Sequence, residues 1–194
     1  MSMKTLASRI QYLGGDQLDR INKQKLRTFQ MATKNSYSTR YIKVDRSVWP
    51  CFIGTMSGGM KADYDYENFA VEYASGLKPG KTFEVLDDGT HWMVYLQKMS
   101  ETAYLFAQIV ECRYTLEVDG KTYWIYCRGP VETDLRWFLK NNININELNL
   151  SARIFIENNE STRKFFKRFT KLKIDGHRWE VQVTDSLSTP GILQ

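Results

Sequence analysis

The sequence predicts a mainly β protein, built from hairpins into a barrel or sandwich, with an N-terminal helical arm and one or two short helices. Three stretches carry this prediction, because in each an Asp-Gly pair separates two runs of alternating apolar and polar residues. Glycine adopts positive φ without steric cost and aspartate tolerates it, so Asp-Gly favours tight turns. Alternation on both sides of a turn directs one row of side chains towards a core. The three stretches are 84–96, 115–127 and 171–183.

Length and composition indicate one folded domain with an extension. The chain has 194 residues, of which 42% are hydrophobic and 13% aromatic, and this content favours a packed core over disorder. No run approaches the ~20 apolar residues that cross a bilayer as a helix, and the N-terminus carries no long apolar stretch. We therefore expect no signal peptide and no contact with a membrane.

The first 35 residues are predicted to form a helical arm, distinct from a β-barrel or sandwich domain of residues 36–194. Asp16 is placed to cap the main helix of the arm. Such a helix either packs on its own domain or docks on a partner. The apolar stripe contains Leu18, Ile21, Leu26 and Phe29, and the polar face is rich in basic residues such as Arg20, Lys23 and Arg27.

The remaining elements follow from alternation and from turn residues. A loop is predicted over 54–65, a short helix over 132–140, and an amphipathic helix over 160–169. Residues 190–194 begin an apolar strand that we expect to continue further or to pair elsewhere. Further strands are predicted over 41–44, 48–53, 68–73, 103–118 and 150–156.

Charge is distributed unevenly along the chain, although the net charge is only +5. Residues 1–46 contain ten Lys or Arg against three Asp or Glu, and residues 61–118 contain five against ten. From residue 119 onward the numbers are twelve and nine. A basic head and an acidic middle favour complementary contacts between copies or with other proteins, although a purely solvated surface shows the same asymmetry.

The sequence offers no recognisable catalytic constellation. Serine hydrolase, zinc protease and phosphate-loop motifs are absent, so an enzyme is the least favoured class. The two histidines, His91 and His177, adjoin Asp-Gly turns, where we expect them to be exposed. Three cysteines without metal-ligand spacing predict buried thiols in a reducing compartment and no metal or other cofactor; they are Cys51, Cys112 and Cys127.

An acidic run, D-Y-D-Y-E, places Asp63, Asp65 and Glu67 at alternate positions. On a strand this spacing directs three carboxylates to one side, where they form either an exposed acidic edge or a site for Mg²⁺ or Ca²⁺. The calcium-loop pattern is not completed, since Asn68 and Phe69 follow. The exposed acidic edge is therefore the preferred interpretation.

A basic segment over 163–173 raises a second possible function, binding of nucleic acid. Phosphates attract its Lys and Arg side chains, and bases stack on aromatic rings. On the predicted helix, however, Phe165, Phe166 and Phe169 fall on one face and the charges on the other. That arrangement favours core packing with a solvated basic face, so nucleic-acid binding by this segment and the basic arm is kept as the alternative.

Several motifs together resemble minor structural proteins of tailed bacteriophages, in particular small neck proteins of the head-closure or collar type. The resemblance extends from Arg20 to the C-terminus. It rests on G-L-K-P-G-K-T-F (76–83) with T-H-W-M-V-Y-L (90–96), on Y-W-I-Y-C-R-G-P-V-E-T (123–133), and on K-I-D-G-H-R-W-E-V-Q-V-T-D (173–185).

The resemblance implies a virion protein that forms a homo-oligomeric ring between portal and tail and helps to close the head. It implies portal or adaptor proteins and tail proteins as partners, with DNA only as the passing genome. Head-closure proteins are small β-barrels whereas adaptors are largely helical, so the strands favour closure, and no catalytic residue is carried over. An acidic segment over 63–117 suits a channel wall that repels phosphates. The candidate partner contacts are Leu18, Arg20, Ile21, Lys23, Arg27, Asp63, Asp65 and Glu67.

Overall fold

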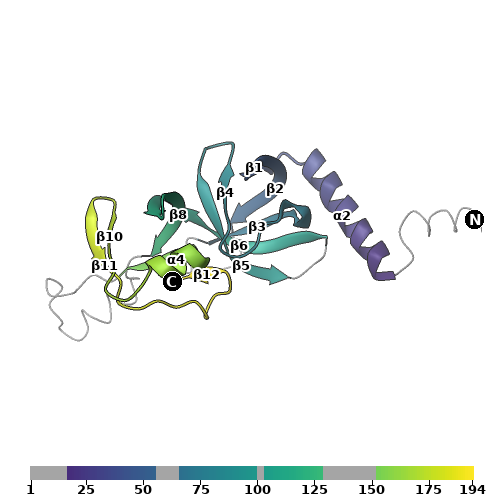
Figure 1. The fold of residues 1–194 in the computed structure, drawn as a ribbon. Coiled ribbons are helices and arrows are strands. Elements are labelled where there is room, and N and C mark those ends of the chain that lie inside the picture. The colour runs from purple at the N-terminus through teal and green to yellow at the C-terminus, as the bar shows by residue number, and fades with distance from the viewer. Residues whose placement is uncertain (1–16, 56–65, 100–102, 129–151) are drawn as a thin grey trace, which may run out of the picture.

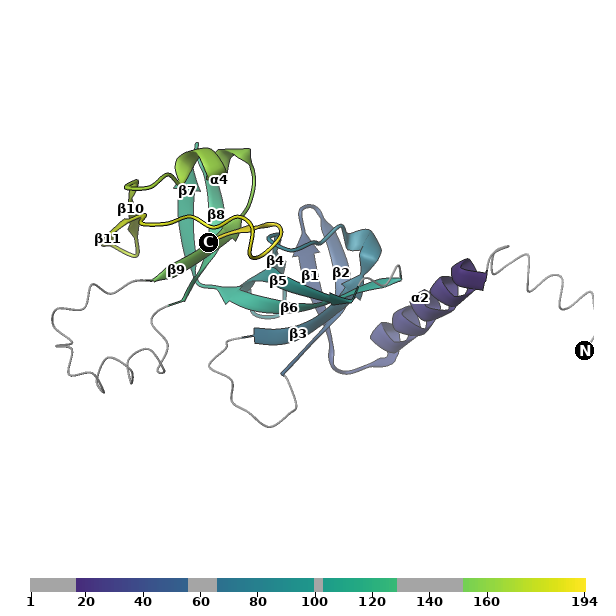
Figure 2. The same cartoon turned by 90° about the horizontal axis from the view of Figure 1, so that it is seen from below.

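A computed structural model of the protein describes residues 17–55, 66–99, 103–128 and 152–194. The fold is mainly β and contains a closed six-stranded barrel, as the sequence predicts (Figure 1). An N-terminal helix, α2 (Gln17–Asn35), leads into the barrel, and a second, smaller β unit follows it. The barrel lies between the helix and the second unit in both views (Figures 1 and 2).

The barrel is closed by antiparallel pairing in the order β1-β2-β3-β6-β5-β4, with β4 returning to β1. Alternate residues of each strand face inward, and their side chains form one apolar core, in which the rings of Phe69 and Phe83 stack with centroids 4.8 Å apart. The strands are β1 (Thr39–Val44), β2 (Ser47–Thr55), β3 (Tyr66–Glu72), β4 (Thr82–Val85), β5 (His91–Met99) and β6 (Tyr104–Cys112), with the 3₁₀ helix η1 (Tyr73–Ser75) after β3.

The second β unit is a four-stranded sheet in the order β12-β9-β8-β7, accompanied by the β10–β11 hairpin and a short helix, α4. Phe166, just after α4, and Leu172 of β10 pack into one apolar cluster with the sheet residues Leu116 and Ile125. The elements are β7 (Tyr114–Val118), β8 (Lys121–Arg128), β9 (Arg153–Glu157), α4 (Glu160–Phe165), β10 (Lys171–Ile174), β11 (His177–Glu180) and β12 (Ile192–Leu193).

A third apolar cluster joins the two units. Only Arg113 separates β6 from β7, so the chain passes directly from the barrel into the second sheet. Residues of β8, β9 and β12 cover the outer side of β5 and β6. This part of the barrel wall is therefore buried on both of its faces. The members of this cluster are Met93, Val110, Cys112, Tyr126, Phe155 and Ile192.

The Asp-Gly turns form as predicted, with one difference. In the β7–β8 and β10–β11 hairpins both residues of the pair have positive φ, as a two-residue type I′ turn requires. The first pair belongs to a longer connection, in which the Gly89 N–H donates to the Val85 carbonyl oxygen at 2.8 Å. The two type I′ pairs are Asp119-Gly120 and Asp175-Gly176.

Several predicted boundaries require correction. The helix expected over 160–169 ends at Phe165, because the following residues leave helical geometry and Phe169 adopts a φ of 68°. Strand β11 ends at Glu180. The Val181 carbonyl oxygen accepts from the Phe169 N–H, because the Thr170 N–H donates to the Lys167 carbonyl oxygen, so the regular ladder stops there. The apolar end of the chain pairs with β9 through Ile192–Leu193. The helix predicted over 132–140 and the arm before Gln17 lie outside the described residues.

Candidate functional site

Helix α2 is attached to the barrel by its C-terminal half. Along its 19 residues only Phe29 and Thr33 are buried. The Phe29 ring stacks on Tyr104 of β6 at a centroid distance of 5.1 Å and meets Phe52 of β2 edge-on at 5.8 Å. These aromatic contacts provide the anchor, since they bury the one large apolar side chain that α2 directs at the barrel.

Hydrogen bonds reinforce this anchor near the end of the helix. The Thr39 hydroxyl donates to the Thr33 carbonyl oxygen at 2.6 Å and ties the last turn of α2 to the start of β1. The Gln30 side-chain amide donates to the Glu72 carboxylate at 3.1 Å, which links α2 to the end of β3. The C-terminal half of α2 is therefore held by both packing and polar contacts.

The N-terminal half of α2 projects away from the barrel. Figures 1 and 2 show this from two directions, with the far end of the helix well clear of the strands. Leu18 and Ile21 are 61% and 43% exposed, although they belong to the apolar stripe. The sequence leaves open whether this helix packs on its own domain or on a partner. In the structure, the two halves of the helix differ in this respect. Phe29 packs on the barrel, whereas the side chains of Leu18 and Ile21 are exposed.

A groove of about 560 Å³ runs along one side of α2 where the helix meets the barrel. Residues 21, 25, 28 and 32 are spaced by four, three and four, so they lie on one helical face. Tyr104 contributes from β6 at the anchored end. The side chains that line the groove are Ile21, Gln24, Lys25, Thr28, Phe29, Ala32 and Tyr104.

A basic face occupies another side of α2. Arg20, Lys23 and Arg27 are spaced by three and four residues and share one face of the helix. Lys23 and Arg27 are exposed, and Arg20 is half-buried. The predicted partner residues of α2 therefore divide into two sets. Leu18 and Ile21 are apolar, and of these Ile21 lines the groove, while the others form the basic face.

The predicted acidic contacts are only partly placed by the structure. Asp63 and Asp65 lie outside the described residues. Glu67 is half-buried in β3 and shares the strand face of Phe69 and Val71, which belong to the barrel core. Glu67 therefore stands at the end of the barrel interior and not on the outer wall.

Other carboxylates of the acidic middle segment have local partners. Asp88 lies 3.4 Å from the Arg40 guanidinium, and a further pair joins Lys43 and Glu84 across β1 and β4 at 3.9 Å. On β6, Glu111 binds the neighbouring Arg113 guanidinium at 2.7 Å. These acids already have basic partners within the same copy, which reduces the charge that they present to a neighbour.

The basic segment over 163–173 does not form the predicted helix with all three phenylalanines on one buried face. Phe166 is buried and Phe165 half-buried, as core packing predicts, but Phe169 is 59% exposed. The Arg168 guanidinium lies over the Phe169 ring, 4.8 Å from its centroid. A bulky residue at positive φ is uncommon, and such strain often accompanies a functional contact.

Among the described residues, the titratable side chains do not form a recognisable catalytic centre. Burial raises the pKa of the Cys51 thiol to about 12 and that of Cys127 to about 11, and it also raises the pKa of Cys112. His177 is exposed as expected, whereas His91 is half-buried and stacks on Trp124 with centroids 3.7 Å apart. Among the described residues, no group of three or more His, Cys, Asp or Glu could hold a metal ion.

Comparisons with protein-family models, curated proteins and solved structures give no match to this chain. Within the described part of the chain, no helix combines the length and apolar character needed to cross a membrane. Sequence reasoning identified Leu18 and Ile21 but missed Tyr104, because no local pattern shows which strand a preceding helix will contact.

Proposed function

We propose that the protein is a structural subunit that assembles with copies of itself through α2, as a ring component of a tailed-phage neck between portal and tail. The observation that carries the proposal is the projection of α2, along which only Phe29 and Thr33 are buried and Ile21 is 43% exposed. The resemblance to head-closure proteins and the closed barrel support the placement in a virion.

The proposed contact joins α2 of one copy to the barrel side of the next. An isolated helix of this length is marginal in water, so the projecting half of α2 gains stability when a neighbour covers its apolar stripe. A head-to-tail contact of this kind forms a ring when its rotation closes. Portal or adaptor proteins and tail proteins then bind the two faces of the ring, and DNA is only the passing genome.

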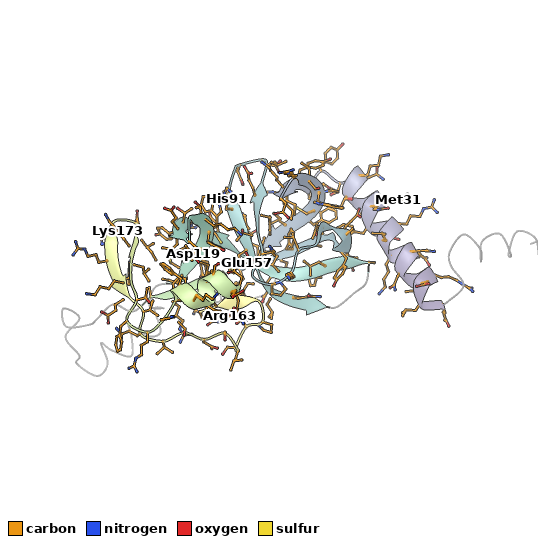
Figure 3. All side chains as sticks on the ribbon, in the orientation of Figure 1. Met31, His91, Asp119, Glu157, Arg163 and Lys173 are labelled. Carbon is orange, nitrogen blue, oxygen red and sulfur yellow. The ribbon has the colours of Figure 1, made fainter. Side chains whose placement is uncertain are left out.

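Light scattering of the full chain, combined with negative-stain images, tests this assembly. Ile21→Glu places a charge in the groove of α2 and should shift the protein to smaller species without lowering its melting temperature. Met31→Glu is the matched control, because Met31 is a 56% exposed apolar residue of α2 that lies outside the groove (labelled in Figure 3). Equal behaviour of both variants, or a wild-type chain that stays monomeric at every concentration, contradicts the proposal.

The basic face provides a second readout of the same contact. Rim charges attract a partner mainly at low salt, since ions screen exposed charges beyond about 10 Å at 0.1 M. Raising salt should therefore weaken assembly of the wild type. Lys23→Glu with Arg27→Glu should reduce this salt dependence, and an unchanged dependence would mean that the basic face lies outside the contact.

A nucleic-acid-binding module is the second candidate, favoured by the exposed Phe169 and the Arg168 guanidinium over its ring. Exposed aromatics beside cations are typical of surfaces that bind single strands by stacking. Fluorescence anisotropy with a single-stranded and a duplex oligonucleotide at two salt concentrations tests it. Phe169→Ala should weaken single-strand binding about tenfold, and Tyr37→Ala, at a fully exposed aromatic elsewhere in the chain, should not. No binding at low salt eliminates this candidate.

A further inference from the structure

The outer wall of the barrel carries exposed apolar side chains where β1 and β4 meet. Ile42 and Val44 of β1 belong to the barrel core, so the side chain of Tyr41, next to Ile42 along the strand, points outward. Tyr41 is 50% exposed. Leu86 follows β4 directly, and its N–H donates to the Tyr41 carbonyl oxygen at 2.9 Å. Leu86 therefore lies beside Tyr41, and its side chain is 43% exposed.

The same apolar surface continues on β2. Pro50 is directly opposite Tyr41, and Val48 lies two residues from Pro50 along β2. Cys51 belongs to the core, so Val48 and Pro50 share the outer side of the strand. Val48 is 55% exposed and Pro50 half-buried. Contiguous exposed apolar groups often mark a contact surface. We call this group the outer patch; it consists of Tyr41, Val48, Pro50 and Leu86.

The outer patch is continuous with the surface that holds α2 in the same copy. Phe52 lies two residues after Pro50 on β2, and alternation places it on the same outer side. The Phe29 ring of α2 meets Phe52 edge-on at 5.8 Å. Helix α2 thus covers one end of an apolar surface on β2 and leaves the outer patch exposed. The exposed part has the same apolar character as the part on which α2 already packs.

The charges around the outer patch are balanced within the same copy except beside Leu86. The balanced charges are the ion pairs Lys43–Glu84 at 3.9 Å and Arg40–Asp88 at 3.4 Å, and the exposed neighbours Asp45 and Arg46 of the β1–β2 turn. Asp87 is exposed next to Leu86 and forms no ion pair with another described residue. This end of the patch is therefore acidic and complements the exposed Arg27 of the basic face of α2.

We propose that the outer patch is the surface that receives α2 of the next copy, an inference that rests on the proposed assembly through α2 and adds its acceptor. Ile21 of the incoming helix packs against Tyr41 and Leu86, and Arg27 lies at the rim beside Asp87. The projecting half of α2 lies clear of the strands of its own copy, so it reaches this patch only on a neighbour (Figures 1 and 2). Helix and patch are different surfaces, so the contact is head-to-tail.

Two variants, each with one damaged surface, test this contact. Ile21→Glu damages the helix and Leu86→Glu damages the patch, so neither should assemble alone. Their equimolar mixture should form a 1:1 complex and nothing larger, because the intact helix of the Leu86→Glu chain fits the intact patch of the Ile21→Glu chain. Light scattering measures the mass, and thermal unfolding shows that both variants are folded.

A matched control separates the patch from a general effect of added charge. Leu96→Glu changes a leucine that is 44% exposed on β5, outside the outer patch, and should assemble like the wild type. Val48→Glu repeats the test at a second position of the patch, should Leu86→Glu lower the melting temperature. It should lose assembly alone and recover the 1:1 complex with Ile21→Glu.

Charge reversal tests the placement of the rim. Asp87→Lys in the Ile21→Glu chain should weaken the 1:1 complex several-fold, as expected for an exposed ion pair. Arg27→Glu in the Leu86→Glu chain should then restore the affinity, because the two charges are opposite again. Glu117→Lys, at an exposed position on β7, should leave the affinity unchanged. A complex that Arg27→Glu fails to restore overturns the placement of Arg27 beside Asp87.

The remaining outcomes distinguish the acceptor from the assembly itself. If Leu86→Glu and Val48→Glu assemble like the wild type while Ile21→Glu does not, the outer patch is not the acceptor, although assembly through α2 stands. If Ile21→Glu assembles and the patch variants do not, two outer patches bind each other and the role of α2 is overturned. A wild-type chain that stays monomeric at every concentration contradicts the proposed assembly and the acceptor together.

Discussion

Gly80 and Gly191 lie backbone against backbone where the barrel meets the second β unit. A Cβ atom on Gly80 would lie 1.8 Å from the Gly191 carbonyl oxygen, and one on Gly191 would lie 2.2 Å from the Pro79 carbonyl oxygen. Both glycines also have positive φ, at 88° and 82°. Beside this contact the Lys81 ammonium and the Glu157 carboxylate pair at 3.0 Å. The contact thus fixes β12 and the end of β9 against the barrel.

Gly80→Ala should destabilise the protein by about 2–4 kcal/mol, because the added methyl group collides with backbone that cannot move independently. Urea unfolding measures the loss. Gly89→Ala is the matched control, since Gly89 also has positive φ but nothing lies within 4 Å of its Cβ position. The control should cost only about 1–2 kcal/mol, the usual cost of the left-handed conformation. Equal losses at the two sites would show that the close approach contributes nothing.

The same contact illustrates which parts of the fold local patterns predict. The Asp-Gly turns, the alternating strands and the helix before them all follow from residues that are neighbours in sequence. Gly80 follows a proline in the motif G-L-K-P-G-K-T-F, and nothing in that motif indicates what its backbone contacts. Its contact with Gly191 joins segments far apart in the chain, and no local pattern specifies such a pairing. Closure of the barrel by β1 and β4 is non-local in the same way.

The tight turn of the β10–β11 hairpin provides the second prediction. Gly176 has a φ of 79° and no heavy atom lies within 4 Å of its Cβ position, so backbone strain alone decides the outcome of a substitution. Gly176→Val should destabilise the protein by about 1–3 kcal/mol, since β-branched residues are strained at positive φ. Gly176→Asn should cost less, because asparagine tolerates this conformation. Urea unfolding with no measurable loss for valine would mean that the turn has rearranged.

Acid sensitivity of the β4–β5 turn is the third prediction. The Thr90 hydroxyl donates to the Asp88 carboxylate at 2.6 Å, and this bond lowers the pKa of Asp88 below its usual 3.8, with help from the Thr90 backbone N–H and Arg40. A lowered folded-state pKa contributes stability above the unfolded value, and this contribution is lost as pH falls through the folded value. The melting temperature should therefore fall below about pH 4.

Asp88→Asn removes this contribution, so its melting temperature should fall less than that of the wild type between pH 5 and pH 3. Asp119→Asn is the control, because asparagine also tolerates the positive φ of that turn. It should follow the wild-type curve. If Asp88→Asn follows the same curve as the wild type, the Thr90 bond does not stabilise the ionised carboxylate.

Only part of the candidate site on α2 could be predicted from the sequence. Spacing alone identifies the apolar stripe with Leu18 and Ile21 and the basic face with Arg27. Spacing does not show where the helix stops touching its own domain, since that depends on the aromatic contact between Phe29 and Tyr104. Leu26 and Phe29 look equivalent to Leu18 in the sequence, yet only Phe29 is buried against the barrel.

This division of α2 predicts different outcomes for two truncations. Deleting residues 1–27 removes the projecting half but keeps Phe29 and Thr33, so the melting temperature should hardly change while assembly is lost. Deleting residues 1–35 also removes the anchor and should cost about 3–5 kcal/mol, as for loss of a buried Phe side chain, although the barrel closes without α2. Phe29→Ala should reproduce that cost in the full chain. Thermal unfolding and light scattering measure both effects. If the shorter deletion abolishes the cooperative transition, the projecting half belongs to the core and the assembly role of α2 fails.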